Sequence, residues 1–134
     1  MTFEWTEYLN LAIKLNSDAK SDFLLREAMY RTSISRAYYS CFNLARNYLI
    51  SIGKVLSKTA DVHREIQVIL ENMSNLESNS DKRKDLIEIS NELGILRSSR
   101  NKADYNNTIN KISMMAESTI IRADKIKKLI ESLY

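Results

Sequence analysis

The absence of proline is the feature that most constrains how this chain folds. Its 134 residues contain no proline and only two glycines, where average usage would give about seven and nine. Sandwiches and barrels need many tight turns, and phosphate-binding loops need glycine-rich segments, so neither is expected. With 44% hydrophobic residues, the chain can build the core of one domain. We therefore predict an all-α, up-and-down bundle of about five helices, forming a single domain over residues 1–134.

Apolar residues recur at three- and four-residue spacing in five segments, which is typical of amphipathic helices. We expect helices over 3–15, from 21 or 22 to 52, from 61 through 73, from about 81 to 104–107, and from about 108 to 133. The polar stretches 16–21 and 74–81 predict a turn and a flexible connection. Asp61 is a candidate helix cap, and Gly53 is a stop signal. At 1.5 Å per residue, the second helix would be about 48 Å long and would lie at the centre of the bundle.

The net charge and the cysteine content indicate which binding partners and which cellular compartment to expect. Twenty Lys and Arg against 17 Asp and Glu leave a net charge of +3, which is compatible with a nucleic-acid partner but weaker than a dedicated basic arm. One cysteine, Cys41, cannot form an internal disulfide, and one cysteine with one histidine does not make a usual zinc site. No secretory signal or long apolar run is present. We expect a cytoplasmic protein with no membrane segment, metal or cofactor.

The apolar seam of the fourth segment ends in polar residues. Leu86, Ile89, Leu93 and Leu96 step by three and four, and the next seam position is Arg100. A guanidinium on a core stripe is costly unless it is paired or faces a cleft. Arg100 can pair with Asp104, and Arg97 with Asn101, because both pairs are at i and i+4. Tyr105 adds a phenol at the end of this helix. These residues predict either a structural ion pair or a polar site.

The second long segment carries two adjacent stripes. One contains Ile34, Tyr38, Cys41, Ala45, Tyr48 and Ile52, and the other contains Ser35, Tyr39, Phe42 and Arg46. A helix with two such faces is central in its bundle or also forms a subunit interface. The aromatic residues favour packing over base stacking. His63 opens the third segment, where a lone histidine predicts a surface residue or a local cap.

Together these residues resemble a known family. Trp5-x-x-Tyr8-Leu9, Ser35-Arg36-Ala37-Tyr38-Tyr39-x-x-Phe42, His63 and Leu96-Arg97-x-x-Arg100-Asn101-x-Ala103-Asp104-Tyr105 are similar to the motifs of compact prokaryotic HEPN-domain proteins (higher eukaryotes and prokaryotes nucleotide-binding). The resemblance implies a helical bundle that forms a homodimer through the face with the polar motif. It also implies a metal-independent ribonuclease of toxin–antitoxin or phage-defence systems.

The resemblance places Arg100 at the motif arginine and Asn101 at the polar residue after it. Asp104 and Tyr105 stand where the family's motif histidine would be sought. Cleavage of RNA without a metal needs a base and an acid, for which Asp104 and Tyr105 are the candidates beside Arg100. Arg36, Arg97, Arg100 and Asn101 are the candidate contacts to RNA or a nucleotide. This set favours phosphate binding over cleavage.

Two other functions stay open at this point. In the first, the chain is a non-catalytic HEPN partner that docks a nucleotidyltransferase, an antitoxin or another effector. In the second, it is a purely structural dimer that uses its polar face for self-association.

Overall fold

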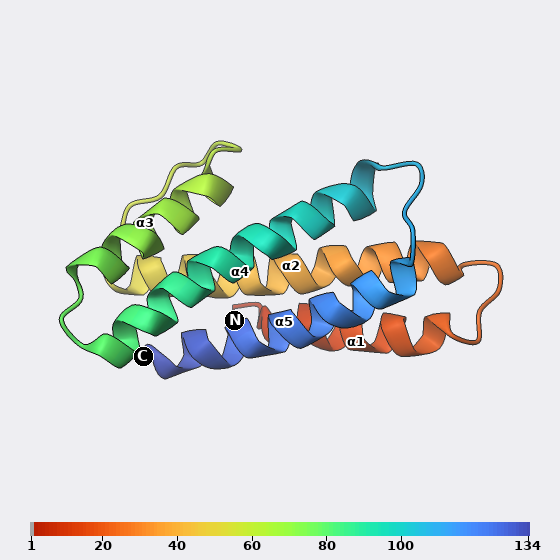
Figure 1. Cartoon of the computed structure of the whole chain (residues 1–134), viewed down its shortest axis with the longest axis horizontal. Helices are drawn as coiled ribbons and strands as arrows, with labels where there is room; N and C mark the ends of the chain where they lie inside the picture. The colour runs from red at the N-terminus through yellow and green to blue at the C-terminus, as the bar shows by residue number, and fades with distance from the viewer. Residues whose placement is uncertain (1) are drawn as a thin grey trace.

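The computed structural model describes residues 2–134, and that stretch contains five α-helices and no strand. The helices lie side by side in a bundle (Figure 1). They are α1 (Thr6–Ala19), α2 (Arg26–Ser51), α3 (Val62–Leu76), α4 (Ser80–Tyr105) and α5 (Ile112–Ser132). Because α2 contacts each of the other helices, the predicted all-α bundle with a central second helix is confirmed. None of the helices described over 2–134 is long and apolar enough to cross a membrane.

The chain reverses direction at three of its four connections. α1 and α2 are antiparallel, as are α3 and α4, and α4 and α5 (Figure 1). The segment 52–61 instead runs back along the bundle, so that α3 follows the direction of α2 (Figure 1). α3 packs mainly against α4 and only slightly against α2. The first turn of α3 is thereby brought toward the middle of the bundle.

Two groups of buried residues form the core. The larger joins all five helices and includes Leu9, Tyr38, Cys41, Leu49, Ile66, Leu70, Leu86, Ile89, Leu93, Leu96, Ala123, Ile126 and Ile130. The smaller lies where α1 ends and α2 begins, and consists of Ala19, Tyr30, Ile34, Ala103 and Ala116. The predicted seam of α4 is buried, as is the Cys41 thiol. Burial raises the pKa of this thiol, which keeps it protonated and unreactive near neutral pH.

The first two helices differ from their expected bounds. α1 continues through 16–19, where a turn was expected, because Ala19 is fully buried in the smaller core. α2 begins at Arg26 and not at 21 or 22. Asp22 instead caps a separate turn, with its Oδ1 accepting from the backbone amides of Leu24 at 3.1 Å and Leu25 at 2.9 Å. As a result α2 has 26 residues, about 39 Å, and is shorter than predicted.

The bounds of α3, α4 and α5 also differ from those expected from the sequence. The flexible connection expected over 74–81 is only 77–79, because α3 runs to Leu76 and the Asn79 side chain caps α4 at Asp81 and Lys82. Asp61 stands at the start of α3, but its side chain makes no cap hydrogen bond. α5 begins at Ile112, after Lys111 in the left-handed region. Gly53 ends α2 with a φ of 89°, as predicted.

Small and polar residues hold α3 against α4. The buried Ser90 hydroxyl of α4 donates to the Gln67 carbonyl at 2.8 Å, and Ser74 of α3 donates to the Arg83 carbonyl at 2.9 Å. Gly94 leaves room for the Gln67 side chain, since a Cβ at this position would lie 2.7 Å from Gln67 Nε2. These contacts fix the axial position of α3, and with it the position of His63.

Candidate functional site

Arg100 makes an ion pair on the half-buried face of α4. Its Nε lies 2.9 Å from Asp104 Oδ2, and 17% and 27% of the two side chains are exposed. The two groups attract each other by charge and do not form a well-directed hydrogen bond, because the buried Nε has no hydrogen-bond acceptor among residues 2–134. The predicted pairing of Arg100 with Asp104 is therefore present. Its guanidinium remains available to a further acceptor.

The predicted pairing of Arg97 with Asn101 is not formed. Arg100 Nη1 donates to Asn101 Oδ1 at 2.9 Å instead. Arg97 is half-buried, and within the described residues it has no ion pair or side-chain hydrogen bond. Because it has no partner among these residues, the Arg97 guanidinium is free to bind an anion.

Tyr39 of α2 connects two arginines. The guanidinium carbon of Arg100 lies 5.1 Å from the centre of the Tyr39 ring, and that of Arg36 lies 5.3 Å from it. Arg36 also lies 4.8 Å from the ring centre of Tyr8 in α1, and Arg100 lies 5.7 Å from that of Tyr105. These distances are within the range of cation–π attraction. Three predicted residues, Arg36, Arg100 and Asp104, thus lie around Tyr39, and Tyr105 lies against Arg100 on its other side.

His63 lies in this cluster, which corrects its expected place as a surface residue or a cap. Its ring stacks on Phe42 with 4.3 Å between the ring centres, and its Nδ1 lies 2.6 Å from the Tyr38 hydroxyl. The Tyr39 ring centre is 6.1 Å away. Sequence spacing gave no signal for this contact, because it joins residues 25 positions apart on different helices. Only the motif resemblance included His63.

Both partners in the hydrogen bond are held neutral. Burial raises the pKa of Tyr38 well above its usual value, although the charges of Arg97 and Arg100 oppose this shift. Burial lowers the pKa of His63, and the charges of Arg97 and Arg100 lower it further. When Nδ1–H donates to the Tyr38 oxygen, the lone pair on Nε2 of the neutral imidazole is free to accept a proton.

Two hollows lie on adjacent faces of α4. One, of about 380 Å³, lies between α1, α2 and α4, and is lined by Trp5, Tyr8, Arg36, Tyr39, Asn43, Arg100 and Asp104. The other, of about 690 Å³, is lined by Gln67, Gly94, Arg97, Ser98, Asn101, Lys102, Tyr105 and Asn106. The Tyr105 side chain is exposed. The predicted site residues are therefore divided between two hollows that meet along the row from Arg97 to Asp104.

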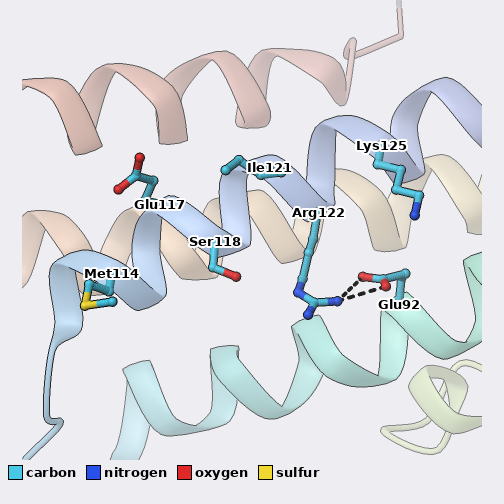
Figure 2. A pocket seen from close by; sticks show the side chains of 7 residues that line it. All are labelled: Glu92, Met114, Glu117, Ser118, Ile121, Arg122 and Lys125. Carbon is cyan, nitrogen blue, oxygen red and sulfur yellow. Dashed lines mark hydrogen bonds and ion pairs between the residues drawn. The ribbon is translucent and has the colours of Figure 1, made fainter.

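A third hollow, between α4 and α5, has no free cation. Figure 2 shows Arg122 reaching Glu92, with Nη1 2.8 and 2.7 Å from its two carboxylate oxygens. Lys125 in the same hollow pairs with Glu88. These charges are already balanced, whereas Arg36 and Arg97 have no acidic partner in the part of the chain that is described. The candidate site therefore lies around α2, α3 and the end of α4.

Arg31 has a structural position at the end of α4. Arg31 Nη1 donates to the backbone carbonyls of Ala103 at 2.9 Å and Asn106 at 2.6 Å, and therefore satisfies carbonyls at the end of α4. Residues 2–134 contain no group of three or more His, Cys, Asp and Glu side chains arranged to hold a metal.

Comparison with known families identifies the family of the chain. The HEPN domain family matches residues 7–133, nearly the whole chain. The chain belongs to the HEPN family. No curated protein matches it. Membership of the HEPN family confirms the resemblance read from the Ser35–Phe42 and Leu96–Tyr105 motifs.

Proposed function

We propose that this HEPN protein binds single-stranded RNA through Arg36, Arg97 and Arg100 and cleaves it without a metal. The observation that carries the proposal is the position of His63, whose Nδ1 lies 2.6 Å from the Tyr38 hydroxyl and whose pKa is lowered by burial and by the charges of Arg97 and Arg100. The HEPN family is commonly linked to ribonuclease activity in defence and toxin systems. The expected setting is therefore a toxin–antitoxin or phage-defence system.

His63 supplies the base that the motif around Arg100 lacks. In the tautomer that carries its hydrogen on Nδ1, the free Nε2 of the neutral imidazole accepts the proton of the ribose 2′-OH, and the 2′-oxygen then attacks the adjacent phosphorus. The bond from phosphorus to the 5′-oxygen breaks, and that oxygen takes a proton from the Tyr105 hydroxyl. The products are a 2′,3′-cyclic phosphate and a 5′-hydroxyl. Asp104 then acts as the partner that orients Arg100 rather than as the base.

The arginines stabilise the charge that develops on the phosphate. Arg97 has no competing acidic partner among the described residues, and Arg100 keeps donors beyond its contacts with Asp104 and Asn101. Guanidinium groups bind phosphate oxygens through paired hydrogen bonds. Groups held in place before the reaction contribute most to transition-state stabilisation.

The test is cleavage of a labelled single-stranded RNA by purified protein in the presence of EDTA. We expect fragments ending in a 2′,3′-cyclic phosphate, and no cleavage of DNA of the same sequence. His63→Ala should lower the rate by about 100-fold or more without weakening RNA binding. Arg97→Ala should weaken binding and reduce its salt dependence by about one charge.

The matched control is Lys128→Gln, which changes an exposed cation at the far end of α5 and should leave cleavage unaltered. Binding without cleavage would disprove the nuclease half of the proposal. Absence of both binding and cleavage at micromolar protein would disprove all of it.

A second function is favoured by the exposure of Tyr105, of which 73% is open to solvent. In this case the polar face of α4 docks a nucleotidyltransferase or an antitoxin, and the chain is not itself the enzyme. Co-expression with the product of a neighbouring gene, followed by co-purification, tests this function. Tyr105→Ala should then abolish the complex.

A further inference from the structure

The hollow of about 380 Å³ between α1, α2 and α4 is lined by aromatic and amide groups that phosphate binding does not need. Three aromatic rings line it, from Trp5, Tyr8 and Tyr39, together with the amide of Asn43. Its size is within the range of small-molecule sites. We infer that this hollow is a base-binding subsite that selects guanine beside the bound phosphate; the inference rests on the RNA-binding function proposed above.

Planar groups in the hollow suit a nucleobase. The Arg36 guanidinium lies over Tyr8 and Tyr39, and the Arg100 guanidinium lies over Tyr39. Unstacked bases of single-stranded RNA bind by stacking on aromatic rings and on guanidinium planes. Because Arg100 also lies in the row that would hold phosphate, a base in this hollow would belong to a nucleotide next to that phosphate.

The amide orientation of Asn43 is fixed by its contact with the backbone. Its Nδ2 donates to the Tyr39 carbonyl at 2.8 Å. A carbonyl oxygen only accepts hydrogen bonds, so the nitrogen must face it and Oδ1 must be the free atom. Asp104 uses Oδ2 for Arg100, which leaves Oδ1 as a second free acceptor. The lining of the hollow therefore includes two free acceptors as well as the guanidinium donors.

Guanine has the complementary set of groups. Its N1–H and 2-amino group are adjacent donors, whereas the Watson–Crick edges of adenine, cytosine and uracil each contain only one donor group. Its O6 and N7 are acceptors that arginine binds as a pair. Asn43 and Asp104 would take the donor edge, and Arg36 would take O6 and N7. A site built to hydrogen-bond a base discriminates against a base that leaves its polar groups unpaired.

The experiment measures affinity for four short RNAs that differ at one position. Each is an oligouridine that is 2′-O-methylated throughout to prevent cleavage, with a central guanine, adenine, inosine or uracil. Fluorescence anisotropy should show about tenfold tighter binding of the guanine strand than of the adenine strand. Inosine lacks only the 2-amino group, and its strand should bind more weakly than the guanine strand.

Asn43→Leu keeps the size of the side chain and removes its acceptor, so we expect it to reduce the guanine preference while leaving affinity for the adenine strand unchanged. Asn47→Leu is the matched control, since Asn47 is exposed one turn further along α2 and outside the hollow.

Equal affinity for the guanine and adenine strands would overturn the subsite and leave the proposed RNA binding intact. A guanine preference that survives Asn43→Leu would also overturn it. Failure to bind any strand would instead count against the proposed function. The inosine comparison uses the unaltered protein, and it decides the question even if Asn43→Leu does not fold.

Discussion

The Tyr38 hydroxyl lies 2.6 Å from Nδ1 of His63 and joins the middle of α2 to the first turn of α3. Phe42 stacks against the same imidazole. The ring is therefore fixed on two sides, at a place where two guanidinium charges oppose its protonation. This arrangement gives the protein its one histidine in a neutral and oriented state.

Because the chain has a single histidine, the titration of His63 can be observed directly. Because burial and the charges of Arg97 and Arg100 lower the pKa of His63, we expect it below the usual value of about 6.5. Removing one charge, in Arg97→Gln or Arg100→Gln, should raise this pKa. The measurement is the pH dependence of the imidazole Cε1 proton signal in NMR spectra.

The control for this titration is Lys128→Gln, because Lys128 pairs with Asp124 on an exposed part of α5. The pKa of His63 should not change in this variant. A pKa that is unmoved by either arginine substitution would show that the guanidinium groups do not act on the imidazole in solution.

Protein stability should fall as the pH decreases below about 6.5. The pKa of His63 is lower in the folded state than in the unfolded chain, so the unfolded chain takes up the proton first. The stabilisation that neutral His63 contributes is complete above the pKa of the unfolded chain and is lost as the pH falls toward the pKa of the folded state. Below that pKa there is no further change. Urea midpoints at pH 7.5, 6.5 and 5.5 measure this loss.

His63→Gln removes the titrating group. The difference in urea midpoint between the original protein and this variant should therefore shrink as the pH falls from 7.5 to 5.5. A difference that stays constant with pH would contradict the depressed pKa.

Arg100 and Asp104 are expected to serve ligand binding more than folding. Both side chains are partly solvated, so Arg100→Ala should cost less than about 2 kcal/mol of stability while weakening RNA binding by about tenfold. Asp104→Asn keeps the shape and removes a negative charge, and should therefore tighten phosphate binding. Thermal melts and binding titrations of both variants provide the measurement.

Two outcomes would contradict this expectation. Equal losses of about 3–5 kcal/mol, with unchanged RNA affinity, would make the pair purely structural. Abolished cleavage in Asp104→Asn, with RNA still bound, would make Asp104 the base in place of His63.

Arg31 is expected to stabilise the fold without contributing to binding. Its guanidinium donates to the carbonyls of Ala103 and Asn106 and connects the start of α2 to the end of α4. Arg31→Ala should lower the free energy of unfolding by about 2 kcal/mol, since hydrogen bonds to charged groups are the stronger ones. Chemical denaturation measures this value, with the exposed Arg64→Ala as a control expected within about 0.5 kcal/mol of the original protein.

The chain is predicted to be a homodimer, because polar residues from Arg97 to Asp104 continue the apolar seam of α4 and the HEPN resemblance implies pairing through the part of the helix that carries this motif. Light scattering at micromolar concentration should give about twice the chain mass of 15.5 kDa. A clean monomer at that concentration would rule out a cleft shared by two subunits.

The sequence by itself determined the helical class and the place where the core of α4 gives way to polar residues. Helical periodicity is a local property, so the positions of Leu86 through Leu96 fixed which face of α4 is buried and put Arg100 next on that face. The same rule brought Arg100 within reach of Asp104, and the structure contains that pair. Helix ends were less predictable, because the burial of Ala19 outweighed the polar character of 16–19.

Only the tertiary structure decided where His63 lies. Its contacts with Tyr38 and Phe42 depend on the return of segment 52–61 along the bundle and on the packing of α3 against α4. The contact between Arg31 and the end of α4 likewise joins residues more than 70 positions apart. Periodicity assigns a residue to a face of its own helix. Which residue of another helix meets that face depends on loop path and axial register, and these are set by the packing of the whole core.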